Sequence, residues 1–424
     1  MTRSSSSLRR AASDVRELPG LRGRGFVLLI GATAIGLCGF AAVLPLVPLW
    51  ATRGGAGEFG AGVTTAVFML TTVLTQLGMP WLLDRGAYRW AFPVGSLVMG
   101  LPTPLFALTS DLLPLVAVSA VRGIGFGMVT VAGTALAARL VPIDQIGRAT
   151  AFYGLAVGLP QVLILPGGVA LALSVGFGPV FWATGVCGVI AAALSSGIWF
   201  ADGGRNRPAL RGAAPTWGVS DPSGDPRGAA LMLLLAPPLM MMLAVSIAAS
   251  GIVTFLAIPF EQAAWLVSGA LALYALFVVV GRWSAGSLYD RRGRTALLLP
   301  GMISAGLGMA LTTVAMWTDG GTGAPAVLTT VCVLGGAGLF GLGFGAVQND
   351  TVTIMLGRAG PSGHGRASAV WNIGYDGGMG AGAVGLGVLI QSLGYGPAFA
   401  LTAVALFAAV PLALGGKRAP NGGQ

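Results

Sequence analysis

The stretch Gly286-Ser287-Leu288-Tyr289-Asp290-Arg291-Arg292-Gly293-Arg294 guides the interpretation of the whole chain. It follows a long apolar run and places one acid among three arginines and two glycines, as expected where a membrane helix reaches water on its basic side. A weaker copy, Pro80 to Arg89, follows another apolar run in the first half of the chain. The two copies indicate that the second half of the chain repeats the first.

The composition is that of a membrane protein. Of 424 residues, 55% are hydrophobic and only 9% are charged, too few to cover the surface of a soluble protein. Apolar runs of about 18 or more residues are typical of membrane helices. We predict an all-α integral membrane protein whose twelve spans lie at 26–50, 60–83, 90–109, 112–140, 148–172, 178–200, 230–259, 264–289, 295–317, 326–356, 367–391 and 396–416.

The basic residues predict how the chain lies in the membrane. The N-terminal segment before the first span carries six arginines, and most of the others fall in the connections after even-numbered spans. Only Arg53 falls on the opposite side, while Arg122 and Arg282 fall inside spans. Because lysine and arginine concentrate in cytoplasmic loops, both termini are predicted to be cytoplasmic. The same distribution explains the net charge of +10 without a nucleic-acid partner.

The repeats define the domains. Gly123–Gly127 returns as Gly341–Gly345 and Gly147–Ala151 as Gly365–Ala369, both at one common offset along the chain (341 − 123 = 365 − 147). Two bundles related by duplication, with a site between them at the membrane midplane, are a transporter architecture. The predicted parts are an N-terminal cytoplasmic tail (1–25), a six-helix bundle (26–200), a cytoplasmic linker (201–228), a second six-helix bundle (229–416) and a C-terminal cytoplasmic tail (417–424).

On these motifs the chain resembles the major facilitator superfamily, and within it the bacterial drug:proton antiporters. The loop motif G-x-L-x-D-R-x-G-R is complete in the second half, but Pro80 and Ala87 replace its glycines in the first. The run from Arg122 to Gly127 resembles the family's second motif with a shortened spacing. The fifth span, with Gly154, Gly158, Pro160, Pro166, Gly167 and Gly168, is similar to the antiporter motif G-x-x-x-G-P-x-x-G-G without being a clean copy.

The resemblance implies a cytoplasmic gating motif, in which Asp290, Arg291 and Arg294 help to hold the cytoplasmic side shut in the outward-facing state. An acid in this position is favoured by the positive end of a neighbouring helix and by arginine hydrogen bonds. Ordinary loop ion pairs of small energy are the alternative. The residues assigned to this motif are Gly286, Asp290, Arg291, Gly293, Arg294, Asp84 and Arg85.

Three charged residues inside the spans are candidates for proton coupling: Asp376, Asp350 and Arg122. Charges inside a membrane are costly and are therefore functional candidates by default. Asp376 lies near the middle of the eleventh span, where a carboxylate removed from water could exchange a proton, or could simply bond a neighbouring helix. Asp350 lies nearer to water and could instead cap a helix. The resemblance gives Arg122 a part in proton coupling, with pairing to a carboxylate or backbone carbonyls as the alternative.

Other positions are candidates for the substrate cavity or for packing. Aromatic and amide side chains that could line the cavity are Trp371, Asn372, Tyr375, Asn349, Gln161 and Tyr274. Small residues let helices approach closely, which predicts packing roles for Gly154, Gly158, Gly374, Gly378 and Gly382. The three cysteines lie in apolar runs, and no spacing predicts a disulfide or a metal site.

These observations predict a secondary transporter. We expect it to use the proton gradient, with no cofactor, to export amphipathic small molecules such as drugs or metabolites, and so to confer multidrug resistance. The alternative is a proton-coupled importer of a small nutrient such as a sugar or an organic acid. Catalytic motifs for an enzyme are missing from the sequence. We expect a monomer in the bacterial cytoplasmic (inner) membrane, with the lipid bilayer and a small-molecule substrate as its partners.

Overall fold

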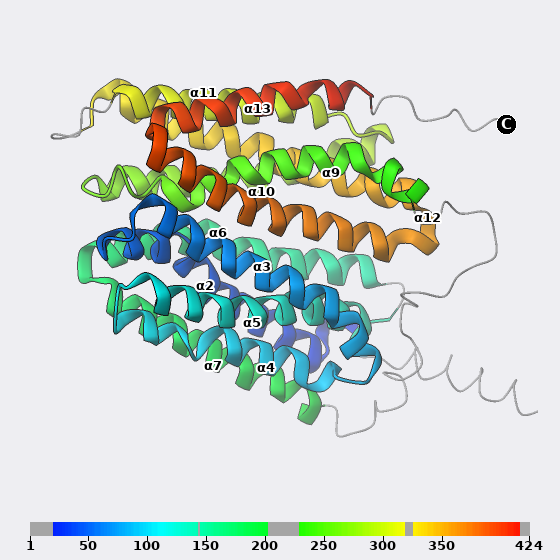
Figure 1. Cartoon of the computed structure of the whole chain (residues 1–424). Helices are drawn as coiled ribbons and strands as arrows, with labels where there is room; N and C mark the ends of the chain where they lie inside the picture. The colour runs from blue at the N-terminus through cyan, green and yellow to red at the C-terminus, as the bar shows by residue number, and fades with distance from the viewer. Residues whose placement is uncertain (1–19, 143–144, 202–228, 319–324, 416–424) are drawn as a thin grey trace, which may run out of the picture.

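The computed structural model describes residues 20–142, 145–201, 229–318 and 325–415, which are almost entirely helical and contain no strand. Figure 1 shows long helices lying side by side in two groups, with the N-terminal half below and the C-terminal half above. Twelve of its helical segments are long and apolar enough to cross a membrane. The predicted all-α fold with twelve spans is therefore confirmed.

The helices of the N-terminal half are α2 (Arg24–Arg53), α3 (Gly57–Asp84), α4 (Tyr88–Gly100), α5 (Leu112–Arg139), α6 (Ile146–Val175) and α7 (Phe177–Ala201). Those of the C-terminal half are α9 (Ala229–Ser250), α10 (Ala264–Arg292), α11 (Leu298–Thr318), α12 (Val327–Leu393) and α13 (Tyr395–Gly415). Among the described residues, short turns of other helix types accompany them: η1 (Gly20–Arg22), η2 (Thr103–Ala107) and η4 (Gly251–Phe255). Each predicted span coincides closely with an observed one.

The structure departs from regular α-helix at two predicted spans. The third span is divided into α4 and the 3₁₀ turn η2, where Pro102 and Pro104 lack the amide hydrogens that a continuous helix needs. The seventh span ends in a π-helical turn, η4, directly after Ser250. Irregular turns of this kind are common near functional sites.

The tenth and eleventh spans belong to a single helical element, α12, of 67 residues. We predicted a loop between them, but helical backbone continues through the reversal. Trp371 Nε1 in the second span donates to Thr351 Oγ1 in the first at 3.0 Å, so the two spans lie against each other. Hydropathy alone could not distinguish a helical reversal from a loop.

The two halves repeat each other in their packing as well as in their sequence. A side chain on Gly123 would meet the backbone of Phe68, and one on Gly341 would meet the backbone of Tyr274. Gly125 lies against Gly95 and Met99, just as Gly343 lies against Gly301 and Ala305.

Two offsets along the chain relate these contacts. A residue of α5 and its counterpart in the first span of α12 differ in number by the longer offset (341 − 123 = 343 − 125). Residues of α3 and α4 and their counterparts in α10 and α11 differ by the shorter offset (274 − 68 = 301 − 95). The predicted duplication is thus present in three dimensions.

The two bundles meet mainly along two pairs of helices, α3 with α12 and α6 with α10. In the duplication, α10 is the counterpart of α3, and the second span of α12 is the counterpart of α6. The two pairs of interface helices are therefore equivalent to each other. The predicted linker (201–228) and the tails (1–25 and 417–424) fall almost wholly outside the described residues. We refer below to the end of the bundles that carries Arg85 and Arg291 as the basic end, and to the end that carries Arg53 and Glu261 as the far end.

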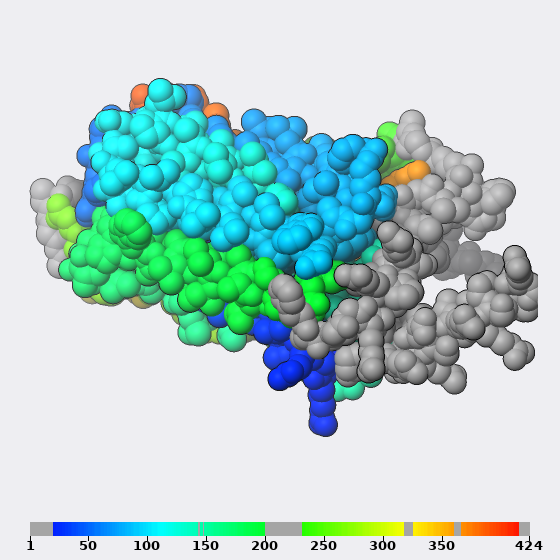
Figure 2. All heavy atoms as spheres, turned by 90° about the horizontal axis from the view of Figure 1, so that it is seen from below, coloured from blue at the N-terminus to red at the C-terminus, as the bar shows by residue number. Residues whose placement is uncertain are grey.

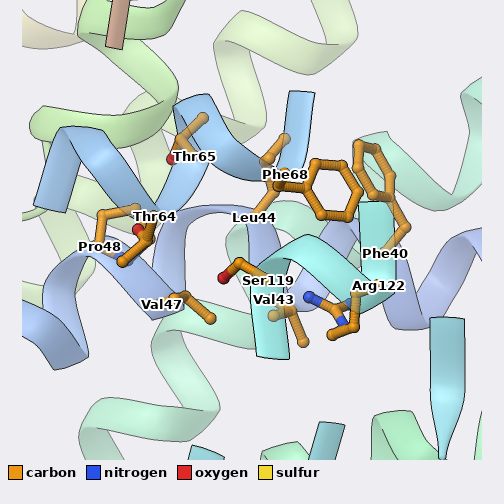
Figure 3. A pocket seen from close by; sticks show the side chains of 10 residues that line it. All are labelled: Phe40, Val43, Leu44, Val47, Pro48, Thr64, Thr65, Phe68, Ser119 and Arg122. Atoms are coloured by element: carbon orange, nitrogen blue, oxygen red, sulfur yellow. The ribbon is translucent and has the colours of Figure 1, made fainter. Parts of the chain in front are cut away.

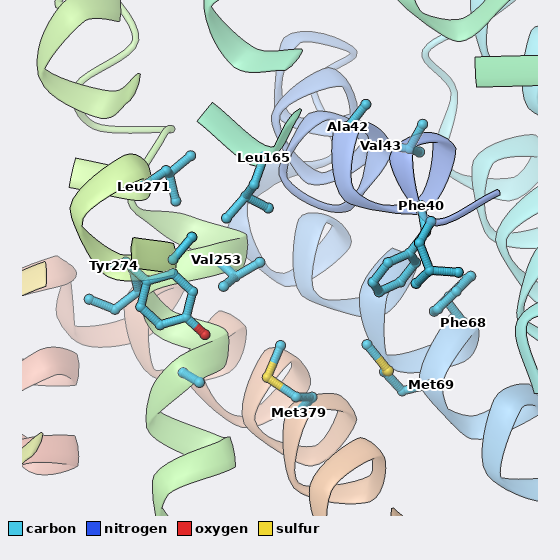
Figure 4. Packing of buried hydrophobic residues seen from close by; sticks show 14 of the residues in the cluster. Phe40, Ala42, Val43, Phe68, Met69, Leu165, Val253, Leu271, Tyr274 and Met379 are labelled. Carbon is cyan, nitrogen blue, oxygen red and sulfur yellow. The ribbon is translucent and has the colours of Figure 1, made fainter. Parts of the chain in front are cut away.

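Apolar side chains fill the interior and also cover the outside. Figure 4 shows Phe40 and Phe68 of the N-terminal half on one side, and Tyr274 and Leu271 of the C-terminal half on the other. Figure 2 looks onto the helices of the N-terminal half. Large apolar residues that are exposed in this half include Leu70, Leu74, Leu77, Trp81 and Trp90. An apolar exterior around a packed interior suits a protein that contacts lipid.

Candidate functional site

Asp376, the leading candidate from the sequence, lies at the interface between the two bundles. Its side chain is 5% exposed, and its Oδ2 accepts a hydrogen bond of 2.8 Å from Gln76 Nε2 of α3. Gln76 Nε2 also lies 3.4 Å from Thr130 Oγ1 of α5. Burial of a carboxylate is costly, and here its described hydrogen-bond partner is a neutral amide rather than a cation. The charge on Asp376 is therefore free to change without breaking an ion pair.

Gln76 is a site residue that the sequence analysis missed. Its Oε1 is buried and has no hydrogen-bond partner among the described residues, although its Nε2 is well used. An amide in an apolar span gives no strong signal in the sequence. The duplication does give one, because the shorter offset places Gln76 and the intramembrane Arg282 at the same position in the two halves (282 − 76 = 274 − 68).

Asp350 lies in the first span of α12 and is fully buried. Its Oδ2 accepts a hydrogen bond of 3.1 Å from the backbone amide of Leu297, directly before α11 begins. An acid that accepts from the first amides of a helix caps that helix and is stabilised by its dipole. Its Oδ1 has no partner among the described residues. The capping role that the sequence left open is the one that this geometry supplies.

Arg122 of α5 is 4% exposed and lines a small pocket between α2, α3 and α5 (Figure 3). Its Nε donates to the backbone oxygen of Met99 at 3.1 Å and to Thr103 Oγ1 at 3.0 Å. The guanidinium carbon also lies 5.8 Å from the ring centre of Phe68 and 5.5 Å from that of Phe106. Carbonyl and aromatic contacts of this kind stabilise a cation away from water. Of the alternatives for Arg122, the structure shows the contact with a backbone carbonyl.

The predicted cavity residues Trp371 and Tyr375 belong to a row of stacked rings. The rings of Trp371 and Tyr375 are 5.8 Å apart, and the ring of Tyr375 is 6.0 Å from that of Phe344. Both predicted residues are only partly buried, whereas Tyr274 at the end of the row is 6% exposed. The row gives the C-terminal bundle an aromatic wall next to Asp376.

The predicted amides have mostly local roles. Asn372 Nδ2 donates to the backbone oxygen of Ser368 at 2.9 Å, and Gln161 Nε2 lies 3.4 Å from that of Val157, each one turn away in its own helix. Asn349 lies beside Gly286 of the gating motif, with its Oδ1 3.7 Å from where a side chain on that glycine would begin. All three are partly buried.

The gating motif ends α10 at the basic end. Gly293 has a φ of +64° and its amide donates to the backbone oxygen of Tyr289, so the second glycine of the motif is the left-handed cap of the helix. Asp290 is exposed. In the first half, where Ala87 replaces this glycine, the positive φ moves to Gly86, at +90°. The first copy of the motif therefore has the same kind of turn, one residue earlier than in the second copy.

The residues around the first copy differ from those of the second. Asp84 is the last residue of α3, and Arg85 stacks on Trp81, with 3.6 Å between the guanidinium carbon and the ring centre. Like Asp290, Asp84 and Arg85 are exposed. The closure of the basic end that we expect from these residues stays a prediction.

The predicted packing glycines fall into two groups. Gly374, Gly378 and Gly382 lie against α9, where added side chains would meet Leu239, Ser246 and Ser250. Gly154 and Gly158 of α6 do not pack in this way, because a Cβ on either would have no other atom within 4 Å. Close packing was the prediction for both groups, so it is corrected for the second. These two glycines border open space.

A duplicated twelve-helix bundle with buried charges at the interface of its halves is the architecture of a membrane transporter. Residues 29–355 match the sequence profile of the Major Facilitator Superfamily, and the chain belongs to this superfamily. No curated protein sequence matches the chain.

Solved structures of transporters share this fold. The nucleoside transporter NupG has a TM-score of 0.66 and 12% identity, over 92% of this chain and 98% of its own. A POT family transporter in complex with a thioalcohol-conjugated peptide has a TM-score of 0.68 and 14% identity, over 92% of this chain and 95% of its own. At these identities the similarity establishes the fold and leaves the substrate open.

Proposed function

We propose that this protein is a proton-coupled secondary transporter that exports amphipathic small molecules by alternating access. The observation that carries the proposal is the hydrogen bond between Asp376 and Gln76, which joins a buried carboxylate of one bundle to the other bundle. A group that both binds a proton and bridges the moving parts can link the proton gradient to their movement.

Protonation of Asp376 would change the number of bonds across the interface. The ionised carboxylate accepts one hydrogen bond from Gln76, and the Oε1 of that amide has no partner among the described residues. A protonated Asp376 can donate its new hydrogen to this oxygen and form a second bond. Protonation is thus expected to favour the present conformation, and loss of the proton to disfavour it.

The present conformation is closed at the far end. Contacts between the bundles run from the ion pair of Arg53 with Glu261, through the bond of 3.3 Å from the amide of Phe59 to Gln391, to Asp376 and Gln76. If the basic end is cytoplasmic, as the arginine distribution predicts, this conformation is closed to the outside. A proton that enters from outside would favour it and leave to the cytoplasm, after which a substrate could bind there for export.

We further propose that the protein acts as a monomer in the bacterial cytoplasmic membrane with both termini in the cytoplasm, and that export of this kind confers resistance to drugs. Arg122 is proposed to position α4 and α5 around the cavity during the cycle, given its bonds to Met99 and Thr103. Transport needs no resident cofactor in this scheme, because the proton gradient is the energy source.

The test is proton flux in proteoliposomes that hold an internal pH dye, with amphipathic cations, organic acids, antibiotics and sugars added in turn. Antiport predicts that some compound drives protons against its own movement, and that Asp376→Asn abolishes this while the protein still folds. Asp111→Asn, which changes an exposed acid at the start of α5, is the control and keeps the flux. Movement of compound and proton in the same direction would support the importer instead. Retained coupling in Asp376→Asn would refute the proposed role of this residue.

A further inference from the structure

Arg282 of α10 is a cation inside a membrane span, and the described residues supply no hydrogen bond or ion pair to its side chain. This side chain is exposed. It lies on the same helix face as Leu271, Ala275 and Val278, which is the face that α10 turns toward the rest of the protein. An intramembrane arginine normally faces a partner or a water-filled cavity.

The duplication indicates what lies opposite Arg282. In one pair of interface helices, Gln76 of α3 meets Asp376 of α12. The shorter offset takes Gln76 to Arg282, and the longer offset takes Gly158 to Asp376 (376 − 158 = 341 − 123). The residue that corresponds to the carboxylate is therefore Gly158.

Equivalent packing supports both offsets at this depth in the membrane. The ring of Tyr153 meets Gly133, and the longer offset takes this pair to Trp371 and Thr351, which are also in contact. Gly127 lies against Thr72, and Gly345 lies against Val278, the residue to which the shorter offset takes Thr72. The helices that carry Arg282 and Gly158 are thus aligned in the same register as those that carry Gln76 and Asp376.

The place of the missing carboxylate borders open space. The α6 and α10 helices are in contact, and Figure 4 shows Leu165 of α6 between the N-terminal helices and Leu271 of α10. Nearer the basic end, a Cβ on Gly154 or Gly158 meets nothing within 4 Å. The interface between α3 and α12 thus holds the amide of Gln76 and the acid of Asp376. The equivalent interface between α10 and α6 holds the cation Arg282 and open space beside Gly158.

The interface between α6 and α10, which carries Arg282, is suited to binding an anion. A guanidinium binds a carboxylate, phosphate or sulfonate through two parallel hydrogen bonds, and such bonds are strong away from bulk water. Tyr375, whose ring stacks with Trp371, lies close enough to Arg282 for an electrostatic interaction. It could add a hydroxyl donor and an apolar surface for the rest of the ligand.

We propose that the transported molecule is an amphipathic organic anion whose charged group binds Arg282 in the gap beside Gly158. This inference rests on the proposed transport function and gives its substrate class. The other interior cation, Arg122, is less suited to this role, because its Nε is already bonded to Met99 and Thr103.

The first experiment measures ligand binding by thermal stabilisation of the purified full-length protein. The probes are benzoate, phenyl phosphate and benzenesulfonate, compared with benzyl alcohol and benzylamine at the same concentration and ionic strength. Anions are expected to raise the melting temperature more than the neutral and cationic compounds. Arg282→Gln should weaken their binding by about tenfold or more, and Arg282→Lys by less. Equal shifts for anions and uncharged compounds, or equal anion binding by Arg282→Gln, would overturn the inference.

A second pair of variants tests the geometry. Gly158→Asp supplies a carboxylate opposite Arg282 and should prevent anion binding by occupying the cation. Gly158→Asn has nearly the same size without the charge, so it fills the gap without occupying the cation and should weaken anion binding less than Gly158→Asp does. In the double variant Arg282→Gln with Gly158→Asp, the second interface would copy the first, and anion binding should stay absent. If Gly158→Asp binds the anions as tightly as Gly158→Asn does, Arg282 does not face this gap and the inference is wrong.

The two proposals can fail separately. Asp376→Asn should keep the binding of anions and lose proton flux. If anions bind through Arg282 but no compound drives proton flux in the wild type, the anion site stands and proton coupling falls. If neutral or cationic compounds drive coupled flux that Arg282→Gln leaves intact, the anion inference falls and proton-coupled transport stands.

Discussion

Arg53 and Glu261 form an ion pair that joins the two bundles at the far end, since Arg53 ends α2 and Glu261 lies between η4 and α10. The guanidinium of Arg53 also lies over the ring of Phe177, 4.6 Å from its centre. Both charged side chains are about one-third exposed, at 39% and 31%. A pair that can be this easily hydrated is suited to opening and closing, because neither charge is stranded when they separate.

Glu261→Gln should shift the protein away from the conformation that is closed at the far end. Exposed pairs contribute about 0.2–1 kcal/mol, so the ratio of the two conformations should change by up to about fivefold. Distances between spin labels on the far ends of the two bundles, in a background without native cysteines, would measure this ratio. The swapped variant Arg53→Glu with Glu261→Arg should restore it. A ratio that responds to neither change would exclude the pair as part of the closure.

Gly62→Ala should shift the same equilibrium further. Gly62 of α3 lies so close to the backbone oxygen of Ala383 in α12 that a Cβ would overlap it. Because this contact joins the two bundles, the added methyl should hinder closure of the far end rather than unfold either bundle. Overpacking costs about 1–3 kcal/mol, which is about five- to 150-fold in the ratio. Gly78→Ala is the matched control on the same helix, because a Cβ there meets nothing within 4 Å.

Asp290→Asn should shift the ratio in the opposite direction. Asp290 is exposed in the present conformation, so its charge contributes little here. If its carboxylate holds the basic end shut in the other conformation, its loss destabilises only that one. The same label distances should then report more of the conformation closed at the far end, together with slower turnover. An unchanged ratio and turnover would show that the motif acts only as a helix end.

The features of this protein that could be predicted from the sequence are those set by whether a residue lies in the membrane or in water. Twelve spans, the duplication and the isolated charges Asp376 and Arg122 all follow from where polar residues interrupt apolar runs. Hydropathy does not report which helices touch, so it could not pair Asp376 with Gln76. It could not separate Gly382, which packs against α9, from Gly158, which borders a gap. The helical reversal within α12 was also missed, because polar residues between two spans suit a loop and a helix equally.

Gln76→Leu should uncouple transport without unfolding the protein. The substitution leaves the carboxylate of Asp376 at an apolar interface without its one described partner. A buried polar group left unsatisfied costs about 1–3 kcal/mol, so the bridge between the bundles should weaken by about five- to 150-fold. Proton flux per folded protein should fall with it. In the double variant with Asp376→Asn, the second change should add little, because both remove one interaction. Additive losses would mean that the two residues act independently.

Variants of Asp350 can distinguish a buried acid that caps a helix from one that binds a transported proton. Its Oδ2 accepts the amide of Leu297 at the start of α11, and an asparagine can accept the same hydrogen bond through its own oxygen. Asp350→Asn should therefore keep both the melting temperature and the proton flux close to those of the wild type. Asp350→Ala removes the cap and should lower stability by about 0.5–2 kcal/mol, with flux per folded protein retained. Loss of flux in a stable Asp350→Asn would instead make Asp350 a second proton-binding residue, since only the ability to ionise separates that variant from the wild type.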